Sequence, residues 1–236
     1  MRTPPLENPP WTIVIPFKGS PEAKSRLSVA AGGYPALENN LRLRFARAFV
    51  QDTVQATLRT DNVGDVIVVS SDAIIVANLP NTITIPDPGK GLNAAITAGL
   101  AHAEAVTPHA PVAVMTGDLP GLNPADLQAA LRLAAQYPRC VVADHTGAGT
   151  TTLTGLPGER LIPRFGNDSH YRHQQDGHHS LAIPLDSTLR QDVDTPIDLR
   201  HALTRGVGEA TRAVVHAAQS SLSDTSLPAA SLERTP

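Results

Sequence analysis

The sequence is poor in the residues on which several classes of protein depend. Cys140 is the only cysteine among 236 residues, so a disulfide within the chain is excluded, and its apolar neighbours predict a buried thiol. Aromatic residues make up 3% of the chain, which argues against base-stacking surfaces for single-stranded nucleic acid. The net charge of -3 gives no basic excess, so we expect no nucleic-acid partner.

Long apolar runs are missing as well. No stretch approaches the roughly 18 apolar residues of a membrane-spanning helix, so no membrane partner is expected. No leader of the secretory type follows Met1, and together with the single thiol this favours a cytoplasmic location. A chain of this length can still bury a full core without disulfides or structural metal, and that core must be built from Ala, Val, Leu and Ile.

The chain does contain strand-length apolar runs that alternate with helix-period stretches. This alternation is typical of an α/β fold with three layers, in which a mostly parallel sheet is flanked by helices. Strands are expected at residues 12–15, 65–69, 82–85, 112–116 and 140–143, with a weaker one at 181–185. Helices are expected at residues 37–58, 92–106 and 124–135.

The remaining segments lack such periodicity. Residues 1–10 contain four prolines and residues 220–236 are rich in Ser, Pro and Ala, so both are predicted to be disordered tails of one domain at 11–219. Residues 147–179 are rich in Gly, Thr, His and Asp. We predict that this long stretch is irregular and functional, because structureless segments inside compact domains are usually functional.

A basic turn follows the first expected strand. It contains Lys18, Gly19, Lys24 and Arg26, and the carboxyl end of a strand is where open α/β sheets bind phosphate groups. We therefore expect these residues to bind a nucleoside triphosphate. The turn is not a Walker A loop, because that motif requires glycine directly before the lysine, where this chain has Ala23. The alternative is a solvated basic loop without a ligand.

Three aspartates are candidate ligands of a divalent metal. Asp118 lies just past the expected strand 112–116, and Asp192 and Asp194 would point to the same face if their segment is extended. A hard cation that bridges phosphate oxygens needs such carboxylates. The alternatives are a turn aspartate at position 118 and a helix-capping segment around 192–198.

Other residues are candidates for contacts to the two substrates. Gly91 precedes the expected helix 92–106, and Asn93 lies in its first turn. Asn93 therefore has two alternative roles: it contacts a base or ribose, or it only caps the helix. Gly149-Thr150-Thr151 and the segment 165–169 combine glycine with hydroxyl groups, which suits them to an acceptor phosphate. His170, His173, His178 and His179 lie close together, but without cysteines or regular spacing they do not predict a structural zinc site.

Taken in order, these motifs resemble the 2-phospho-L-lactate guanylyltransferase family, which includes phosphoenolpyruvate guanylyltransferases and acts in biosynthesis of the deazaflavin coenzyme F-420. The resemblance spans about residues 11–205. It rests on the following motifs: Ile15-Pro16-Phe17-Lys18, Ala23-Lys24-Ser25-Arg26-Leu27, Gly91-Leu92-Asn93, Gly117-Asp118-Leu119-Pro120, Gly149-Thr150-Thr151, Phe165-Gly166 with Ser169 and His173, and Asp192-Val193-Asp194-Thr195.

The resemblance implies a nucleotidyltransferase fold of the nucleotide-diphospho-sugar transferase type, GTP as donor, Mg²⁺ as metal and pyrophosphate as second product. The acceptor would be phosphoenolpyruvate or 2-phospho-L-lactate. By resemblance, acceptor binding is expected of Thr151, Gly166 and Ser169, and metal binding of Asp118, Asp192 and Asp194. From the residues themselves we expect nucleotide binding by Lys18, Gly19, Lys24, Arg26, Gly91 and Asn93, and catalytic roles for Lys18, Lys24, Arg26 and Asp118.

Three points stay open at this stage. Many members of the family have asparagine where this chain has Thr151, so the acceptor is not fixed. The rival functions are a related nucleotidyltransferase or nucleotide-sugar transferase with another acceptor, and a nucleotide-binding module without catalysis. A homodimer is compatible with the sequence but not determined by it.

Overall fold

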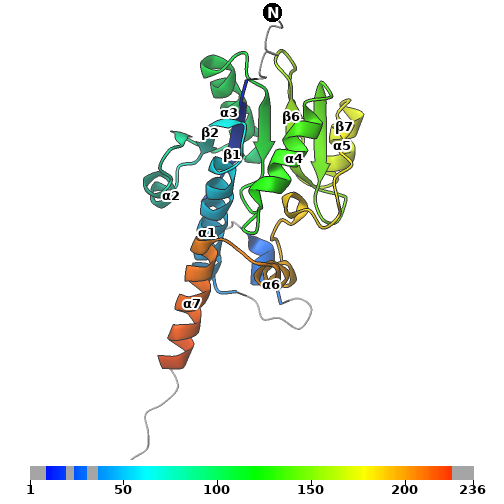
Figure 1. Ribbon diagram of the computed structural model, residues 1–236. Helices are drawn as coiled ribbons and strands as arrows, with labels where there is room; N and C mark the ends of the chain where they lie inside the picture. Colours follow the sequence, from blue (N-terminus) through cyan, green and yellow to red (C-terminus); the bar gives the residue numbers. More distant parts are fainter. Residues whose placement is uncertain (1–8, 20–23, 31–36, 225–236) are drawn as a thin grey trace, which may run out of the picture.

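The centre of the protein is a mixed β-sheet covered by helices on both faces. A computed structural model describes residues 9–19, 24–30 and 37–224. In this part of the chain the sheet has the strand order β3-β2-β1-β4-β6-β5-β7 (Figure 1). Its strands are β1 (Trp11–Pro16), β2 (Val63–Val69), β3 (Ile83–Ile85), β4 (Val112–Met115), β5 (Arg139–Ala143), β6 (Thr150–Gly155) and β7 (His179–Ser180).

The helices connect the strands and follow the last of them. The α-helices are α1 (Asn39–Leu58), α2 (Ala73–Asn78), α3 (Leu92–Val106), α4 (Pro124–Ala134), α5 (Ser169–Gln175), α6 (Pro196–Arg205) and α7 (Glu209–Asp224). Two short 3₁₀ turns are η1 (Ser25–Ser28) and η2 (Thr188–Arg190). Of the helices in the described ranges, none is both long and apolar enough to cross a membrane.

The pairing of the strands gathers several strand ends at one edge. β1 pairs in parallel with β2 and β4, and β2 pairs in parallel with β3. β6 is antiparallel to both β4 and β5, so β5 runs in the same direction as β4. The carboxyl ends of β1, β4 and β5 and the start of β6 therefore lie at the same edge of the sheet.

Both faces of the central strands are buried. Ile13 and Ile15 of β1 pack in one cluster with Val50 of α1 and Leu127 of α4. Val14 faces the other way, into a second cluster that includes Ile96 of α3. Burial on both faces explains why the strands are continuous apolar runs rather than alternating ones. Cys140 belongs to the first cluster and is buried, as expected.

Most of the elements expected from the sequence are confirmed. The five stronger strand predictions correspond to β1 to β5, and the three helix predictions correspond to α1, α3 and α4. The start of α4 follows the predicted chemistry, because the side chain of Asn123 accepts a hydrogen bond from the backbone N–H of Ala125 and Pro124 opens the helix.

Two predictions about secondary structure are wrong. Residues 181–185 do not form a strand: Leu181 donates one backbone hydrogen bond to Val141, after which Ile183 bonds back to Leu181 and turns the chain away. The segment 147–179 is not irregular throughout, because it contains β6, α5 and the start of β7. β6 consists mainly of buried threonines, with Leu153 as its one aliphatic residue, so it lacks the apolar run that marks the other strands.

The chain ends differently from the prediction. Residues 220–224 continue α7 and are therefore not part of a disordered tail, and α7 lies alongside α1 (Figure 1). The first turn of α7 is held by the carboxylate of Asp52, which accepts hydrogen bonds from the backbone of Ala210 and Thr211, each at 2.9 Å. The other parts of the predicted tails, residues 1–8 and 225–236, lie outside the described residues.

Candidate functional site

Three carboxylates meet at the carboxyl edge of the sheet. Asp118, Asp192 and Asp194 each offer one oxygen atom, and these atoms all lie within 4.8 Å of one another. Asp118 follows β4, whereas the other two lie on an extended segment between η2 and α6. The predicted grouping of these three aspartates is therefore present in the structure.

A single buried valine places the two later aspartates. Val193 is buried with Phe45 and Phe49 of α1, and its backbone N–H donates to the carbonyl of Asp118 at 3.0 Å. With Val193 anchored in the core, its two neighbours are directed toward the loop after β4. Helix capping belongs to the next residues, where Thr195 and Asp198 form a capping box at the start of α6.

The basic turn lies against these carboxylates. The ammonium group of Lys24 contacts Asp118 and lies 2.6 Å from Oδ1 of Asp194, and Nη1 of Arg26 lies 3.1 Å from Oδ2 of Asp194. The Lys24 side chain is 13% exposed. The alternative of a solvated basic loop is therefore wrong for Lys24, although Arg26 is largely exposed.

Lys24 adopts a backbone conformation that is uncommon for its residue type. Its φ angle is 56°, in the left-handed region that residues with a side chain rarely occupy. Such conformations persist where surrounding contacts hold them, and they cluster at functional sites. The two carboxylate contacts of Lys24 are contacts of this kind.

A small cavity joins the basic turn to Asp118. Its volume is about 120 Å³, and Lys18, Gly19, Lys24 and Asp118 all line it. Gly19 has a φ angle of +62°, and a Cβ atom there would lie 2.6 Å from Cβ of Asp72. Only glycine therefore fits at this point of the turn.

The charges in the cluster shift the proton affinities in opposite directions. Burial, together with the neighbouring Asp118 and Asp194, raises the pKa of Asp192 to about 6, against a smaller opposing effect of the hydrogen bond from His145. Burial acts to raise the pKa of Asp194, but the charge and hydrogen bond of Lys24, together with the charges of Arg26 and His145, outweigh it and lower that pKa. The pKa of Lys24 is raised, because the two carboxylates outweigh the effect of its burial.

The donor set fits a hard divalent cation. Oδ1 of Asp118 is buried and has no hydrogen-bond partner among the described residues, which leaves an acceptor oxygen at the cluster. Buried acceptors without a partner are costly unless water or an ion satisfies them. Three carboxylate oxygens at this spacing match the oxygen ligands that Mg²⁺, Mn²⁺ and Ca²⁺ prefer.

Asn93 does not cap α3, and its side chain instead binds the backbone of Phe165. The helix α3 is capped by Gly91, whose φ angle is +92°, so Asn93 is not the cap. Its side-chain oxygen accepts from the N–H of Phe165 at 2.9 Å, and its amide nitrogen donates to the carbonyl of Phe165 at 3.2 Å. Asn93 thus links α3 to the segment 165–169, and its contact to a nucleotide stays a prediction.

The predicted acceptor residues come together near the start of β6. The buried hydroxyl of Thr151 has no hydrogen-bond partner in the part of the chain that the structure describes. The backbone carbonyl of Thr151 accepts a hydrogen bond from the N–H of Thr116, two residues before Asp118. Ser169 is buried, and its N–H bonds to the carbonyl of Gly166, which has a φ angle of +117°. The next residue, His170, donates its N–H to Ala148. Binding of an acceptor by this group stays a prediction.

His173 fixes the loop that carries these residues. Its Nε2 accepts the backbone N–H of Arg164 at 2.9 Å, so the neutral ring carries its proton on Nδ1, which donates to Oγ1 of Thr150 at 3.0 Å. Burial lowers the pKa of His173 to about 4, and nearby His178 adds to the effect. The histidine cluster therefore contains a neutral structural histidine.

Sequence analysis missed His145. It follows β5 at the same edge of the sheet, and its Nδ1 lies 3.1 Å from Oδ1 of Asp192. The signal was available, because a polar residue just past a buried strand is the pattern that identified Asp118. His145, Asp192 and Asp198 also line a cavity of about 310 Å³ next to the acidic cluster.

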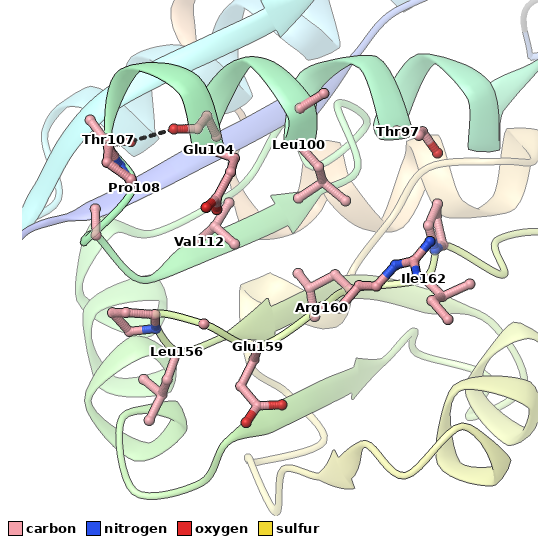
Figure 2. A pocket seen from close by; sticks show the side chains of 17 residues that line it. Thr97, Leu100, Glu104, Thr107, Pro108, Val112, Leu156, Glu159, Arg160 and Ile162 are labelled. Atoms are coloured by element: carbon pink, nitrogen blue, oxygen red, sulfur yellow. Dashed lines mark hydrogen bonds between the residues drawn. The ribbon is translucent and has the colours of Figure 1, made fainter.

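A larger cavity than either of these lies elsewhere. It measures about 470 Å³ and is bounded by α3 and the segment 156–163, with Leu100, Glu104 and Arg160 in its wall (Figure 2). None of the candidate site residues lines it. Size alone therefore does not identify the functional site in this protein.

Comparison with known proteins agrees with the geometry. The model of the family described as "Guanylyl transferase CofC like" matches residues 11–232. A phosphoenolpyruvate guanylyltransferase of Streptomyces coelicolor is 45% identical over 207 residues, which cover 86% of this chain and 95% of that protein. The enzyme of the same name from Thermomonospora curvata is 43% identical over 86% of this chain and 88% of its own length.

The fold has solved relatives at lower identity. A crystal structure from Desulfovibrio desulfuricans, named as a nucleotide-diphospho-sugar transferase, has a TM-score of 0.66 at 20% identity and covers 91% of this chain and 97% of its own. The expected three-layer nucleotidyltransferase fold is thus confirmed. The match over nearly the whole domain, together with the sequence identities, shows that this chain belongs to the CofC-like guanylyl transferase family.

Proposed function

We propose that this protein is a guanylyltransferase that moves GMP from GTP onto the phosphate of phosphoenolpyruvate and releases pyrophosphate. The observation that carries the proposal is the cluster of Asp118, Asp192 and Asp194 facing Lys24 and Arg26 at the carboxyl edge of the sheet. Phosphoenolpyruvate is the acceptor in the names of the relatives, and 2-phospho-L-lactate is the alternative that the family resemblance allows. We place the reaction in the cytoplasm and in coenzyme F-420 biosynthesis.

The three aspartates would hold Mg²⁺, which would offset the charge of the triphosphate and of the leaving pyrophosphate. An oxygen of the acceptor phosphate attacks the α-phosphorus of GTP, a new P–O bond forms, and the bond from that phosphorus to the β-phosphate oxygen breaks. The electron pair leaves with pyrophosphate. A phosphate monoester is already largely ionised near pH 7, so the protein needs no general base for the attack.

The main difficulty of this reaction is to bring two polyanions together. In our proposal Lys18, Lys24 and Arg26 bind the phosphates and reduce their repulsion, and Thr151, Gly166 and Ser169 hold the acceptor. The glycine at position 19 lets the backbone of the basic turn approach the phosphates closely. Positioning of the two substrates then supplies much of the remaining acceleration.

The test is a substrate matrix with pyrophosphate release as the readout. The protein is incubated with Mg²⁺, each of the four nucleoside triphosphates, and each of phosphoenolpyruvate, 2-phospho-L-lactate, 3-phosphoglycerate and a sugar 1-phosphate. We expect pyrophosphate only with GTP, and more with phosphoenolpyruvate than with any other acceptor. Release of pyrophosphate with the sugar 1-phosphate would instead identify a related nucleotidyltransferase with another acceptor. Tight GTP binding without turnover on any acceptor would identify a non-catalytic module.

A further inference from the structure

Asp192 differs from the other two aspartates of the cluster in its partner. Asp118 and Asp194 both contact Lys24, whereas the oxygen Oδ1 of Asp192 lies 3.1 Å from Nδ1 of His145. A carboxylate accepts hydrogen bonds and cannot donate them, so Nδ1 carries the proton and His145 is the donor. Asp192 is therefore held by His145, whereas Asp118 and Asp194 are held by the basic turn.

The loop that carries His145 is held by several backbone contacts. The guanidinium group of Arg190 donates two hydrogen bonds to the carbonyl of Asp144, from Nε at 3.2 Å and Nη2 at 2.9 Å. The N–H of Asp144 donates to the carbonyl of Gly149, and the N–H of Gly147 donates to the carbonyl of Asp144. The backbone next to His145 is thus fixed on both sides of the turn.

The other ring nitrogen of His145 limits how the ring can turn. Nε2 lies 3.7 Å from Oδ1 of Asp198, the residue whose other carboxylate oxygen completes the capping box of α6. The imidazole therefore lies between two carboxylates whose own positions are fixed by the start of α6 and by the anchored Val193. A ring in this position can hold Asp192 in one orientation.

We propose that His145 is a positioning residue for the divalent-metal site, and that its Nδ1–H fixes the rotation of the Asp192 carboxylate so that the ion is bound by all three aspartates. The proposal rests on the function proposed above. Hydrogen bonds to the ligands of a metal orient those ligands, and their loss typically weakens metal binding by about 10- to 100-fold. The histidine itself contacts neither the ion nor the substrates.

Two other roles of His145 predict different results. If the ring only fills space, an apolar residue of similar size leaves metal binding unchanged. If His145 acts mainly as a positive charge beside the site, its removal tightens the binding of a cation, because like charges repel. The positioning role is the only one of the three in which an apolar replacement weakens metal binding.

The experiment measures Mn²⁺ binding to the full chain without nucleotide, by the electron paramagnetic resonance signal of free Mn²⁺. The variants are His145→Leu, His145→Asn and His145→Gln. Asparagine keeps an N–H donor on the atom bonded to Cγ, where Nδ1 stands, whereas glutamine moves its donor one atom further out. We expect His145→Leu to weaken binding about tenfold or more, His145→Gln to weaken it similarly, and His145→Asn to stay within about threefold of the natural protein.

His201→Leu is the matched control, because His201 is exposed on α6 and lines the same 310 Å³ cavity. We expect its Mn²⁺ affinity to equal that of the natural protein. The Mg²⁺ concentration for half-maximal pyrophosphate release should rise in His145→Leu, while the rate at saturating Mg²⁺ changes little. Thermal unfolding without metal verifies that each variant is folded, and if leucine prevents folding, the contrast between asparagine and glutamine still decides.

The outcomes separate this inference from the function on which it rests. Natural protein that binds no Mn²⁺ would overturn the proposed metal site itself. Natural protein that binds Mn²⁺ while His145→Leu binds it equally well or more tightly would overturn only the role of His145. The role of His145 would also be overturned if His145→Asn weakened Mn²⁺ binding as much as His145→Leu does, or if His201→Leu lost as much Mn²⁺ affinity as His145→Leu.

Discussion

The ammonium nitrogen of Lys24 lies 2.6 Å from Oδ1 of Asp194, and the same group also contacts Asp118. One lysine therefore neutralises two of the three candidate metal ligands. In the proposed reaction the three carboxylates attract both Lys24 and the divalent ion. Both cations would also bind the phosphates of GTP and offset their charge. Lys24 would therefore compete with the metal for the carboxylates as well as bind phosphate.

Replacing Lys24 by methionine should change metal binding and catalysis in opposite directions. Mn²⁺ should bind more tightly to Lys24→Met without nucleotide, because the competing charge is gone, and the rate of pyrophosphate release should fall about a hundredfold, or roughly 2.7 kcal/mol. Lys18→Met is the comparison, because Lys18 is exposed at the same cavity. Its rate should fall without any gain in Mn²⁺ affinity. Unchanged Mn²⁺ affinity in Lys24→Met would contradict the competition.

Asp118→Ala should abolish most of the activity and leave the fold intact. We expect a loss of transition-state stabilisation on the order of 3 to 5 kcal/mol, or a rate reduced about a hundred- to several-thousandfold. The loop after β4 should persist, because the backbone of Asp118 accepts a hydrogen bond from Val193 and Leu119 N–H donates to Thr53. Steady-state kinetics and far-UV circular dichroism measure the two effects.

The control for this variant is Asp65→Ala, at an exposed position on β2 outside the cluster. It should behave like the natural protein in both measurements. Natural turnover in purified Asp118→Ala would remove Asp118 from the mechanism.

His173 should make stability depend on pH. Its pKa in the folded protein is about 4, below the ordinary value of 6.5, so the folded state binds this proton more weakly than the unfolded state does. The stabilisation is complete above pH 6.5 and is lost as the pH falls toward 4, by an amount on the order of 3 kcal/mol. Urea unfolding at pH 7 and pH 4.5 measures it.

His173→Gln removes the titrating group and two hydrogen bonds from a buried position. It should be less stable than the natural protein at pH 7 and should lose less stability between pH 7 and 4.5. His109→Gln, at an exposed histidine, should follow the natural protein. If the variant at His173 keeps the full pH dependence, other groups cause it.

Asn93→Ala should affect the acceptor more than the nucleotide. Asn93 holds Phe165 by two hydrogen bonds, so its loss should loosen the segment 165–169 and raise the KM for phosphoenolpyruvate several-fold. The loss of those bonds should also lower the free energy of unfolding by about 1 to 3 kcal/mol. The KM for GTP and the preference for GTP over ATP should change little. A selective loss of that preference would instead show that Asn93 contacts the base.

The sheet was predictable where strands are apolar on both faces, and it was missed where they are not. β1 and β4 combine β-branched and aliphatic residues, so their burial leaves a clear pattern. β6 is equally buried but consists mainly of threonine, and its pairing partners β4 and β5 supply the apolar surroundings that make it a strand. Threonine favours strands, but β6 has only one aliphatic residue, Leu153, so the apolar run that identified the other strands is absent.

The candidate site also has residues that the sequence identified and contacts that only the structure revealed. Asp118 was identified by its place after a strand, and Asp192 and Asp194 by their spacing of two in an extended segment. The place of His145 just past a strand could have identified it as a candidate, but its pairing with Asp192 could not be predicted. The two residues lie 47 apart in the sequence, and their contact depends on how η2 and the loop after β5 pack. The role of Asn93 as a link to Phe165, 72 residues away, was hidden for the same reason.

The sequence by itself determined which residue types stand at the ends of strands, because burial and turn chemistry are local and leave periodic patterns. Only the tertiary structure decided that Lys24 contacts Asp118 and Asp194, which are 94 and 170 residues further along the chain. Contacts of this kind form when parallel strands and a buried valine bring distant loops to one sheet edge. Their energies depend on that arrangement rather than on any neighbour in the sequence.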